Sequence, residues 1–544
     1  MTGVLLGPPG TGKTEASTTL AERWLRKGHG PASVAYLSYT RAAAQAAAER
    51  IARGEMDERR FKEEFPLFRT IHSLAYKALL EAKPDLRVLT RVDMRAFAKE
   101  TGYGGKFVVP DWEDLVEHGR EAEVAPETHW DMAHLAYSVG RLRARSGDEM
   151  AASRNALPRS AIKYIGFLEE NVYLAFVTKY EAWKAREGVV DFTDMLEFAL
   201  TEAPPVSACR YVVIDEAQDL GPAMHGIVDR LFPMADEIVW VGDEDQAIYS
   251  FSGASSSLFL ERARTASWVM KLTQTHRFGQ GIADFSARII RRVKERIEKN
   301  VVGRPDRGGR ASLSGGFKPV AGPHLILHRH VAGCREVARA YVEAGLPFRN
   351  ERGRDPLSLG SRVKAWRALD LLASGAKAAL VSARLIVEDL LPSMAVDESD
   401  VKIRLVVHGA KKGLDEKHGN DLVSLADMVA MKILTPDGAE AVKTKRYSLM
   451  KHRDDLEYYD RVTRNGYPLE ARWPVITTIH GSKGRQAPNV ILFAEASRRC
   501  RSDPDGEHRL AYVGATRTEG DVDICVERKV DWADSPYTYP VEAD

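Results

Sequence analysis

The sequence of 544 residues is poor in cysteine, has almost no net charge and lacks any long apolar run. Its four cysteines are scattered, without a CxxC pair or a matching histidine spacing, which argues against a zinc or iron–sulfur site and fits a reducing cytosol. A formal net charge of +1 does not announce a nucleic-acid partner, so any basic groove must be local. No apolar stretch approaches membrane-spanning length, and no internal repeat of solenoid type is present.

The sequence does contain a complete phosphate-binding motif close to its start. An apolar strand, Val4–Leu6, leads into residues that match G-x-x-x-x-G-K-[ST], namely Gly7, Pro8, Pro9, Gly10, Thr11, Gly12, Lys13 and Thr14. The glycines let backbone N–H groups face a phosphate chain, and the following helix directs its positive dipole end to the same place. Lys13 would bind the β- and γ-phosphates, and the Thr14 hydroxyl would ligate Mg²⁺. Many nucleoside triphosphatases share this loop, so it does not identify the reaction.

Short apolar strands alternate with helical segments after this motif, which indicates a parallel α/β sheet. The strand Val34–Tyr39 precedes an alanine-rich helix over Thr40–Ala52, for which Thr40 is the expected N-cap. A length of 544 residues favours three or four domains.

In the stretch Tyr211–Leu220 a β-branched run ends in two carboxylates, as expected for a buried parallel strand with acids at its C-terminal end. Asp215 would hold Mg²⁺, directly or through water, and Glu216 would orient and deprotonate the attacking water. A solvated acidic strand end is the alternative, but a phosphate loop upstream in the same sheet favours the catalytic interpretation.

A third apolar strand, Ile238–Val241, runs into a polar loop that contains Gln246, Tyr249 and Phe251. This loop is expected at the same edge of the sheet, where Gln246 could sense the γ-phosphate by hydrogen bonding. Tyr249 and Phe251 could stack on nucleic-acid bases, although packing in the core is the alternative for both.

The rest of the chain predicts helical insertions and a second α/β region. Leu80–Ala185 is rich in Ala, Glu and Arg and has little strand character. A basic helix is predicted over Ile282–Ile297, and the α/β pattern resumes with the strand-like Leu325–Leu327. The pattern weakens from about residue 378 to residue 473, which we interpret as a second insertion.

Eight motifs, taken in order, resemble those of the UvrD/Rep family of superfamily 1 DNA helicases. They are GPPGTGKT, SYTRAAA, TIHSL, DEAQD, VGDEDQAIYSFSGA, LTQTHRF, TIHGSKG and EHRLAYVGATR. The resemblance implies an α/β protein with two RecA-like parallel-sheet cores that bind ATP between them, each interrupted by a mainly helical insertion. The implied first core is 1–77 and 190–264 with 78–189 inserted, and the second is 265–377 and 472–544 with a shortened insertion over 378–471.

The resemblance also implies an activity and a set of site residues. The activity is ATP-dependent movement along single-stranded DNA in the 3′→5′ direction, with unwinding of duplex DNA and little sequence preference. Glu216, Gln246, Arg277 and Arg517 would be catalytic, with Thr14 and Asp215 on Mg²⁺. His276, Gly484 and Gln486 would join the phosphate loop in binding ATP. The DNA track would use Tyr39, Thr70, His72, Ser73, Tyr249, Phe251 and His480.

The sequence departs from the family pattern mostly around the base and sugar of the nucleotide. Glu15 replaces the usual arginine, His276 the usual tyrosine and Gln486 the usual acidic residue; Ser252 replaces an arginine in the third-strand loop. The glutamine motif that usually precedes the first strand is missing. Since none of these positions contacts the phosphates, we expect intact hydrolysis with loose discrimination among nucleoside triphosphates.

Other functions are compatible with parts of this pattern. One is a translocase that strips proteins from single strands or needs a partner to unwind, which the short second insertion favours. A helicase–nuclease would need an added nuclease domain, and a kinase or ring-forming ATPase would not need both Arg277 and Arg517 in one chain. We expect single-stranded DNA and single-strand/duplex junctions as partners, no membrane, and a monomer when isolated. The expected location is a bacterial or phage-infected cytosol, and the compact chain favours a phage or mobile-element origin.

Overall fold

The computed structural model describes residues 1–38, 40–103, 128–155, 157, 168–250, 254–350, 360–396, 402–408, 421–468, 474–494 and 503–526. Two six-stranded all-parallel sheets dominate this part of the chain, which confirms the predicted α/β class with two RecA-like cores. Internal contacts divide the chain into two compact units: one contains Met1–Gly316, Arg329–Val331 and Thr478–Asp544, and the other Phe317–His328 and Ala332–Thr477.

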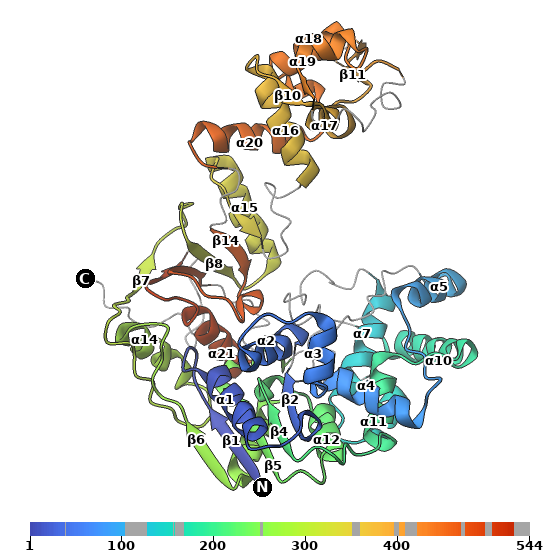
Figure 1. The fold of residues 1–544 in the computed structure, drawn as a ribbon, viewed down its shortest axis with the longest axis vertical. Coiled ribbons are helices and arrows are strands. Elements are labelled where there is room, and N and C mark those ends of the chain that lie inside the picture. Colours follow the sequence, from blue (N-terminus) through green and yellow to red (C-terminus); the bar gives the residue numbers. More distant parts are fainter. Residues whose placement is uncertain are drawn as a thin grey trace. The chain divides into compact units, whose positions relative to one another are not determined.

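The first sheet lies in the first unit and has the strand order β3-β2-β4-β5-β1-β6 (Figure 1). Its strands are β1 (Thr2–Leu6), β2 (Val34–Ser38), β3 (Phe68–Thr70), β4 (Tyr211–Ile214), β5 (Glu237–Gly242) and β6 (Trp268–Lys271). Because β6 pairs in parallel with β1, it belongs to this sheet. Strand β6 lies beyond residue 264, the predicted end of the first core, and its short, exposed run carries no sign of which sheet it joins.

Helices cover both faces of the first sheet because successive strand side chains point to opposite sides. Leu5 packs with α1 and α2, whereas its neighbours Val4 and Leu6 pack on the other face with α4, α11 and α12. The helices around the sheet are α1 (Lys13–Arg26), α2 (Arg41–Ala52), α3 (Glu58–Glu64), α4 (Ile71–Ala82), α11 (Phe192–Thr201), α12 (Pro222–Leu231) and α13 (Ser256–Thr265). Short 3₁₀ turns are η1 (Pro31–Ser33), η4 (Ala217–Asp219) and η5 (Glu244–Gln246). Thr40 caps α2 as predicted, its side chain accepting from the Ala43 N–H at 3.1 Å.

The named elements that the structure describes in the first insertion are all helices, and its core is rich in aromatic side chains. Its elements are α5 (Arg91–Thr101), α7 (His129–Leu142), α8 (Gly147–Ala152), η3 (Ser153–Asn155) and α10 (Glu170–Glu187).

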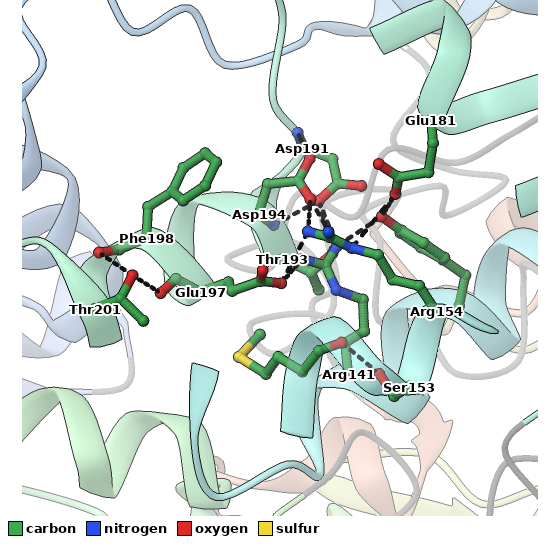
Figure 2. Close-up of polar contacts among 12 residues, drawn as sticks. Arg141, Ser153, Arg154, Glu181, Asp191, Thr193, Asp194, Glu197, Phe198 and Thr201 are labelled. Carbon is green, nitrogen blue, oxygen red and sulfur yellow. Dashed lines mark hydrogen bonds and ion pairs between the residues drawn. The ribbon is translucent and has the colours of Figure 1, made fainter. Parts of the chain in front are cut away.

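Buried ion pairs connect this insertion to α11 (Figure 2). The Arg141 guanidinium of α7 lies 2.8 Å from Asp194 Oδ1, and Lys184 Nζ of α10 lies 3.1 Å from Asp191 Oδ2. Asp191 and Asp194 also form the capping box of α11. Breaking one such pair would leave the partner charge buried and uncompensated, so the network ties three helices together.

The remaining elements of the first unit include three strands of a second sheet, whose order is β7-β16-β15-β8-β14-β9. In this unit β16 pairs in parallel with both β15 and β7. The elements are α14 (Gln280–Ile290), β7 (Ala311–Ser314), η11 (His480–Ser482), β15 (Asn489–Phe493), α21 (Pro504–Ala515) and β16 (Val522–Cys525). The helix predicted over Ile282–Ile297 thus ends at Ile290, and the chain beyond it takes an irregular path.

The second unit contains three strands of that sheet and the second insertion. Its strands are β8 (His324–His328), β9 (Arg349–Asn350), β10 (Ala378–Ala379), β11 (Met394–Val396), β12 (Lys402–Arg404), β13 (Leu422–Val423) and β14 (Val475–Thr478). Its helices are α15 (Val331–Ala344), α16 (Gly360–Ala373), α17 (Leu380–Leu385), the π-helical turn η7 (Ile386–Leu390), α18 (Leu425–Ala430), α19 (Pro436–Lys443), η10 (Tyr447–Leu449) and α20 (Arg453–Arg464).

Helix α16 was predicted to belong to the second core, but it packs against α17 and α19. A Lys445 ion pair to Asp370 of α16 at 2.6 Å strengthens this association. Helix α16 thus packs with helices of the predicted second insertion although it precedes residue 378. Among the described helices, none is long and apolar enough to cross a membrane.

Candidate active site

The phosphate loop connects β1 to α1 in the conformation that the glycines allow. Gly10 and Gly12 have φ values of 76° and 81°, which side-chain-bearing residues rarely adopt. Gly12 is the N-cap of α1 and no side chain caps this helix end. Lys13 Nζ donates to the Gly7 carbonyl at 2.6 Å, so the ammonium group lies over the loop. The loop therefore presents an uncapped helix N-terminus and a positive charge to an anion.

The acids after β4 lie at the same sheet edge as the phosphate loop. Strands β1, β5 and β4 are adjacent and parallel, so the segments after them emerge together. Asp215 Oδ2 accepts from the Tyr36 hydroxyl at 2.8 Å. Burial, followed by the neighbouring Glu216 charge, raises the pKa of Asp215 to about 6. A nearby cation would favour its ionised form, so Asp215 and the Thr14 hydroxyl have the chemistry to hold Mg²⁺.

Glu216 has a strained backbone and a charged environment. Its φ of 52° is left-handed, which costs about 1–3 kcal/mol in a residue other than glycine and is most common at functional sites. Burial alone would raise its pKa, but Lys483 and Lys13 hold the pKa of Glu216 below its ordinary value. Gln218 Nε2 donates to Glu216 Oε2 at 2.5 Å. Glu216 is therefore an ionised, oriented carboxylate beside the phosphate loop.

Gln246 lies in the turn η5 and is held from both sides. Its Nε2 donates to Asp243 Oδ2 at 2.8 Å, and its Oε1 accepts from Arg517 Nη2 at 3.1 Å. Asp243 N in turn donates to Gln218 Oε1 at 2.9 Å, which joins this turn to the segment that carries Glu216.

Arg277 and Arg517 bring two guanidinium groups to this region. Arg517 is only 2% exposed, and burial, followed by the charge of Arg277, lowers its pKa to about 9. Arg277 Nη1 donates to the Thr516 carbonyl at 2.9 Å, and its buried Nε makes no hydrogen bond within the described part of the chain. A Cβ added at Gly10 would lie 2.6 Å from the Arg277 Cβ, so this arginine packs directly on the phosphate loop.

The arginines and Lys13 therefore belong to one site. Glu216 interacts electrostatically with Lys13 and also with Arg517. Arg517 is buried and Arg277 is half-buried. Because the hydrogen-bond acceptors of these guanidinium groups include neutral oxygens, the pair lacks a full counter-charge, which a bound anion would supply.

Sequence reasoning missed Lys483 and Asp219. Lys483 Nζ forms an ion pair with Asp219 and lies 3.3 Å from the Gln246 carbonyl. Burial raises the pKa of Asp219 to about 7 even though Lys483 opposes the shift. Both residues belong to motifs quoted above, Asp219 to DEAQD and Lys483 to TIHGSKG. Their charge and their place within a motif were the signals in the sequence that could have identified them as site residues.

The residues predicted to border the base and ribose are solvent-exposed. His276 donates its backbone N–H to the Gly10 carbonyl at 2.8 Å, which places this segment beside the phosphate loop. Gly484 and Gln486 are exposed, and Gly484 has a φ of 82°. Glu15 pairs with Arg50 at 3.0 Å.

The predicted DNA track is only partly described, since Tyr39 and Phe251 lie outside the described residues. Tyr249 and His480 are 3% and 6% exposed, with ring centroids 6.2 Å apart, so neither offers an open stacking face here. Thr70 caps α4 by accepting from the Ser73 N–H at 3.1 Å. His72 lies against Phe192 with 6.1 Å between ring centroids, and burial lowers the pKa of His72 to about 4. These DNA contacts stay predictions.

Comparisons with known proteins find similarity to one group of helicases. Residues 2–267 match the family model of the UvrD/REP helicase N-terminal domain, and residues 475–523 match that of the UvrD-like helicase C-terminal domain. The chain is 30% identical over 169 residues to ATP-dependent DNA helicase UvrD2 of Mycobacterium tuberculosis, covering 29% of this chain and 23% of the relative. It is 24% identical to DNA helicase IV of Escherichia coli, covering 54% and 46%, and 20% identical to DNA helicase II of Haemophilus influenzae, covering 64% and 61%. Each match covers less than two thirds of the relative's length.

Proposed function

Because the chain belongs to the UvrD/Rep family of helicases, we propose that it couples hydrolysis of ATP to movement along single-stranded DNA. The observation that carries the proposal is the pair of guanidinium groups, Arg277 and Arg517, beside the phosphate loop and Glu216. A transferring phosphoryl group spreads negative charge over its oxygens, and buried cations that lack a full counter-charge stabilise that charge.

Each side chain has a role in this proposal. Lys13 binds the phosphates, Glu216 takes the proton of the attacking water, and the two arginines stabilise the γ-phosphate. Thr14 and Asp215 would hold Mg²⁺, which supplies neutralising charge at the phosphates when bound. The side-chain amide of Gln246 uses one N–H on Asp243 and one carbonyl lone pair on Arg517. Its other N–H and its other lone pair remain for the γ-phosphate and the attacking water.

Nucleotide turnover would be linked to motion of the two cores. A ligand shifts the equilibrium between two domain arrangements only if it makes different contacts in each of them. Arg277 and Arg517 come from the segments assigned to the second core, so they would bind the nucleotide only when the cores close. The expected track contacts phosphates and base faces, which gives little sequence preference.

Duplexes with a single-stranded tail test this function and its direction. We expect ATP-dependent strand separation of a 3′-tailed duplex and none of a blunt or 5′-tailed duplex. Measured strand release from all three substrates, with and without ATP, decides the polarity. Efficient release from the 5′-tailed duplex alone would contradict the 3′→5′ direction.

A second candidate is a translocase that strips proteins from single strands or unwinds only with a partner, favoured by the predicted shortness of the second insertion. Single-stranded DNA would then stimulate ATP hydrolysis while the tailed duplex stayed intact. For the same polypeptide we also propose a monomeric state and a cytosolic location.

Nucleotide choice should be loose. Glu15 is engaged with Arg50, and the His276 and Gln486 side chains are exposed, so we expect weak recognition of the base. Steady-state hydrolysis of ATP, GTP, CTP and UTP should give kcat/KM values within about a hundredfold of one another, which corresponds to about 2.7 kcal/mol. A larger preference for ATP would show that other groups recognise adenine.

A further inference from the structure

The irregular segment after α14 lies against three consecutive acids, Asp243, Glu244 and Asp245, here called the acidic turn. Lys299 Nζ lies 2.9 Å from Asp243 Oδ1, 2.6 Å from Glu244 Oε1 and 3.0 Å from Asp245 Oδ2. The Lys299 side chain is only 1% exposed, and the side chains of the three acids are equally well buried. One lysine thus contacts all three carboxylates in a dry environment.

A second cation and a backbone group complete the enclosure of the acidic turn. Arg296 binds Asp245 through two hydrogen bonds of 3.0 and 2.7 Å, and the Ile297 N–H donates to Glu244 Oε1 at 2.7 Å. Three carboxylates therefore face two cations. Because an uncompensated charge is costly away from water, the acidic turn depends on both cations.

Lys299 is connected to the candidate active site through the two oxygens of Asp243. One oxygen contacts Lys299, and the other accepts from Gln246 Nε2 at 2.8 Å. The opposite end of the same amide accepts from Arg517. Arginine can only donate and an ionised carboxylate can only accept, so the two partners together allow a single orientation of the Gln246 amide.

That restriction holds only while Asp243 stays ionised, since a protonated carboxyl could also donate. Burial alone would raise the pKa of Asp243, but Lys299 holds it below its ordinary value. Lys299 thereby keeps Asp243 ionised, and this carboxylate is the acceptor that sets the orientation of the Gln246 amide.

We propose that Lys299 is a positioning residue for Gln246: through Asp243 it fixes the amide in the orientation that leaves one N–H and one carbonyl lone pair for the nucleotide and the attacking water. This inference rests on the proposed role of Gln246 at the γ-phosphate. The irregular path after α14 fits this role. A continuing helix would use the Ile297 N–H in its own hydrogen bonds and could not bring Lys299, Arg296 and that N–H to the acidic turn together.

A double-mutant cycle tests the inference, using Gln246→Ala, Lys299→Met and the combination. We expect Lys299→Met to lower kcat about 10- to 100-fold, the range found for residues that orient the ligands of a catalytic metal through hydrogen bonds. The KM for ATP should change little, since Lys299 does not touch the nucleotide. The combined variant should be no slower than Gln246→Ala, because Lys299 would act only through that amide.

Two further variants keep the test decisive if Lys299→Met folds poorly. Asp243→Asn leaves two carboxylates facing two cations, so it should fold, and it should lower kcat without adding to Gln246→Ala. Arg296→Met is the matched control: it removes a cation that binds Asp245 instead of Asp243, so thermal stability should fall while kcat stays near wild type.

Fully additive effects of Lys299→Met or Asp243→Asn with Gln246→Ala would overturn the inference, as would an equal loss of kcat in Arg296→Met. Wild-type hydrolysis by Gln246→Ala would instead contradict the proposed role of Gln246 itself, and the inference would fall with it. Lys299 variants that match Gln246→Ala and do not add to it would support both.

Discussion

Replacement of Glu216 by glutamine is expected to abolish ATP turnover while leaving the binding of ATP and DNA intact. The glutamine keeps the shape of the side chain and can still accept from Gln218 Nε2, which lies 2.5 Å from Glu216 Oε2. The glutamine amide cannot accept a proton from water. Glu216 can, because Lys483 and Lys13 hold its pKa below the ordinary value against the effect of burial and so keep the carboxylate ionised. Loss of a general base lowers kcat about 10²- to 10⁴-fold, to be measured as phosphate release at saturating ATP.

The matched control for this variant is Glu237→Gln at the opposite end of β5. Glu237 accepts from Trp268 Nε1 at 3.1 Å and lies at the start of its strand, away from the phosphate loop. The Glu237→Gln protein should hydrolyse ATP at the wild-type rate. Hydrolysis by Glu216→Gln at a rate near wild type, with Glu237→Gln also active, would remove Glu216 from the catalytic role.

Replacement of Arg517 by alanine should lower ATP hydrolysis by about 10³-fold or more, the range known for arginines that stabilise phosphoryl transfer. Arg517 donates to Gln246 Oε1 at 3.1 Å and to the Val513 carbonyl at 2.9 Å, both of them neutral oxygens. Its charge therefore has no full compensation before an anion binds. Single-turnover hydrolysis separates this loss from weaker ATP binding.

A stability measurement separates this role from a structural one. The pKa of Arg517 is lowered to about 9 by burial and by Arg277, which means that folding disfavours the charged guanidinium. By linkage, Arg517→Met should therefore melt no lower than the wild type in the absence of nucleotide. Arg517→Lys keeps the charge but loses the planar fork, so its hydrolysis should lie between those of the wild type and Arg517→Ala. An Arg517→Met protein that is strongly destabilised yet active would contradict the assignment.

Much of the first core was predictable because its signals are local. Val4–Leu6, the glycine loop and the helix after it follow from the nearby sequence; the structure has β1 within two residues of the predicted strand and α1 directly after the loop. The cap at Thr40 and the buried strand before Asp215 were predicted for the same reason. Propensity, capping and apolar runs act over a few residues, so a single sequence is enough to locate them.

The features that the sequence did not predict depend on distant contacts. The apolar spacing of Ile282–Ile297 resembles a single helix, but the backbone departs after Ile290 and Arg296 and Lys299 meet buried acids about fifty residues earlier in the chain. The membership of β6 in the first sheet was likewise set by its pairing with β1. The burial of Tyr249 against His480 is a third contact of this kind, since the two residues are more than two hundred positions apart in the sequence.

The sequence by itself determined which functional groups this protein carries: the phosphate loop, the two acids after β4 and the order of motifs that identifies its family. Those features are short, and each is specified by residues that are neighbours in the chain. Only the tertiary structure decided which charges face one another, such as Arg517 with Gln246 and Lys299 with Asp243. The reason is that the free energy of a buried charge depends on what surrounds it after folding, and those surroundings are supplied by segments that the local sequence does not contain.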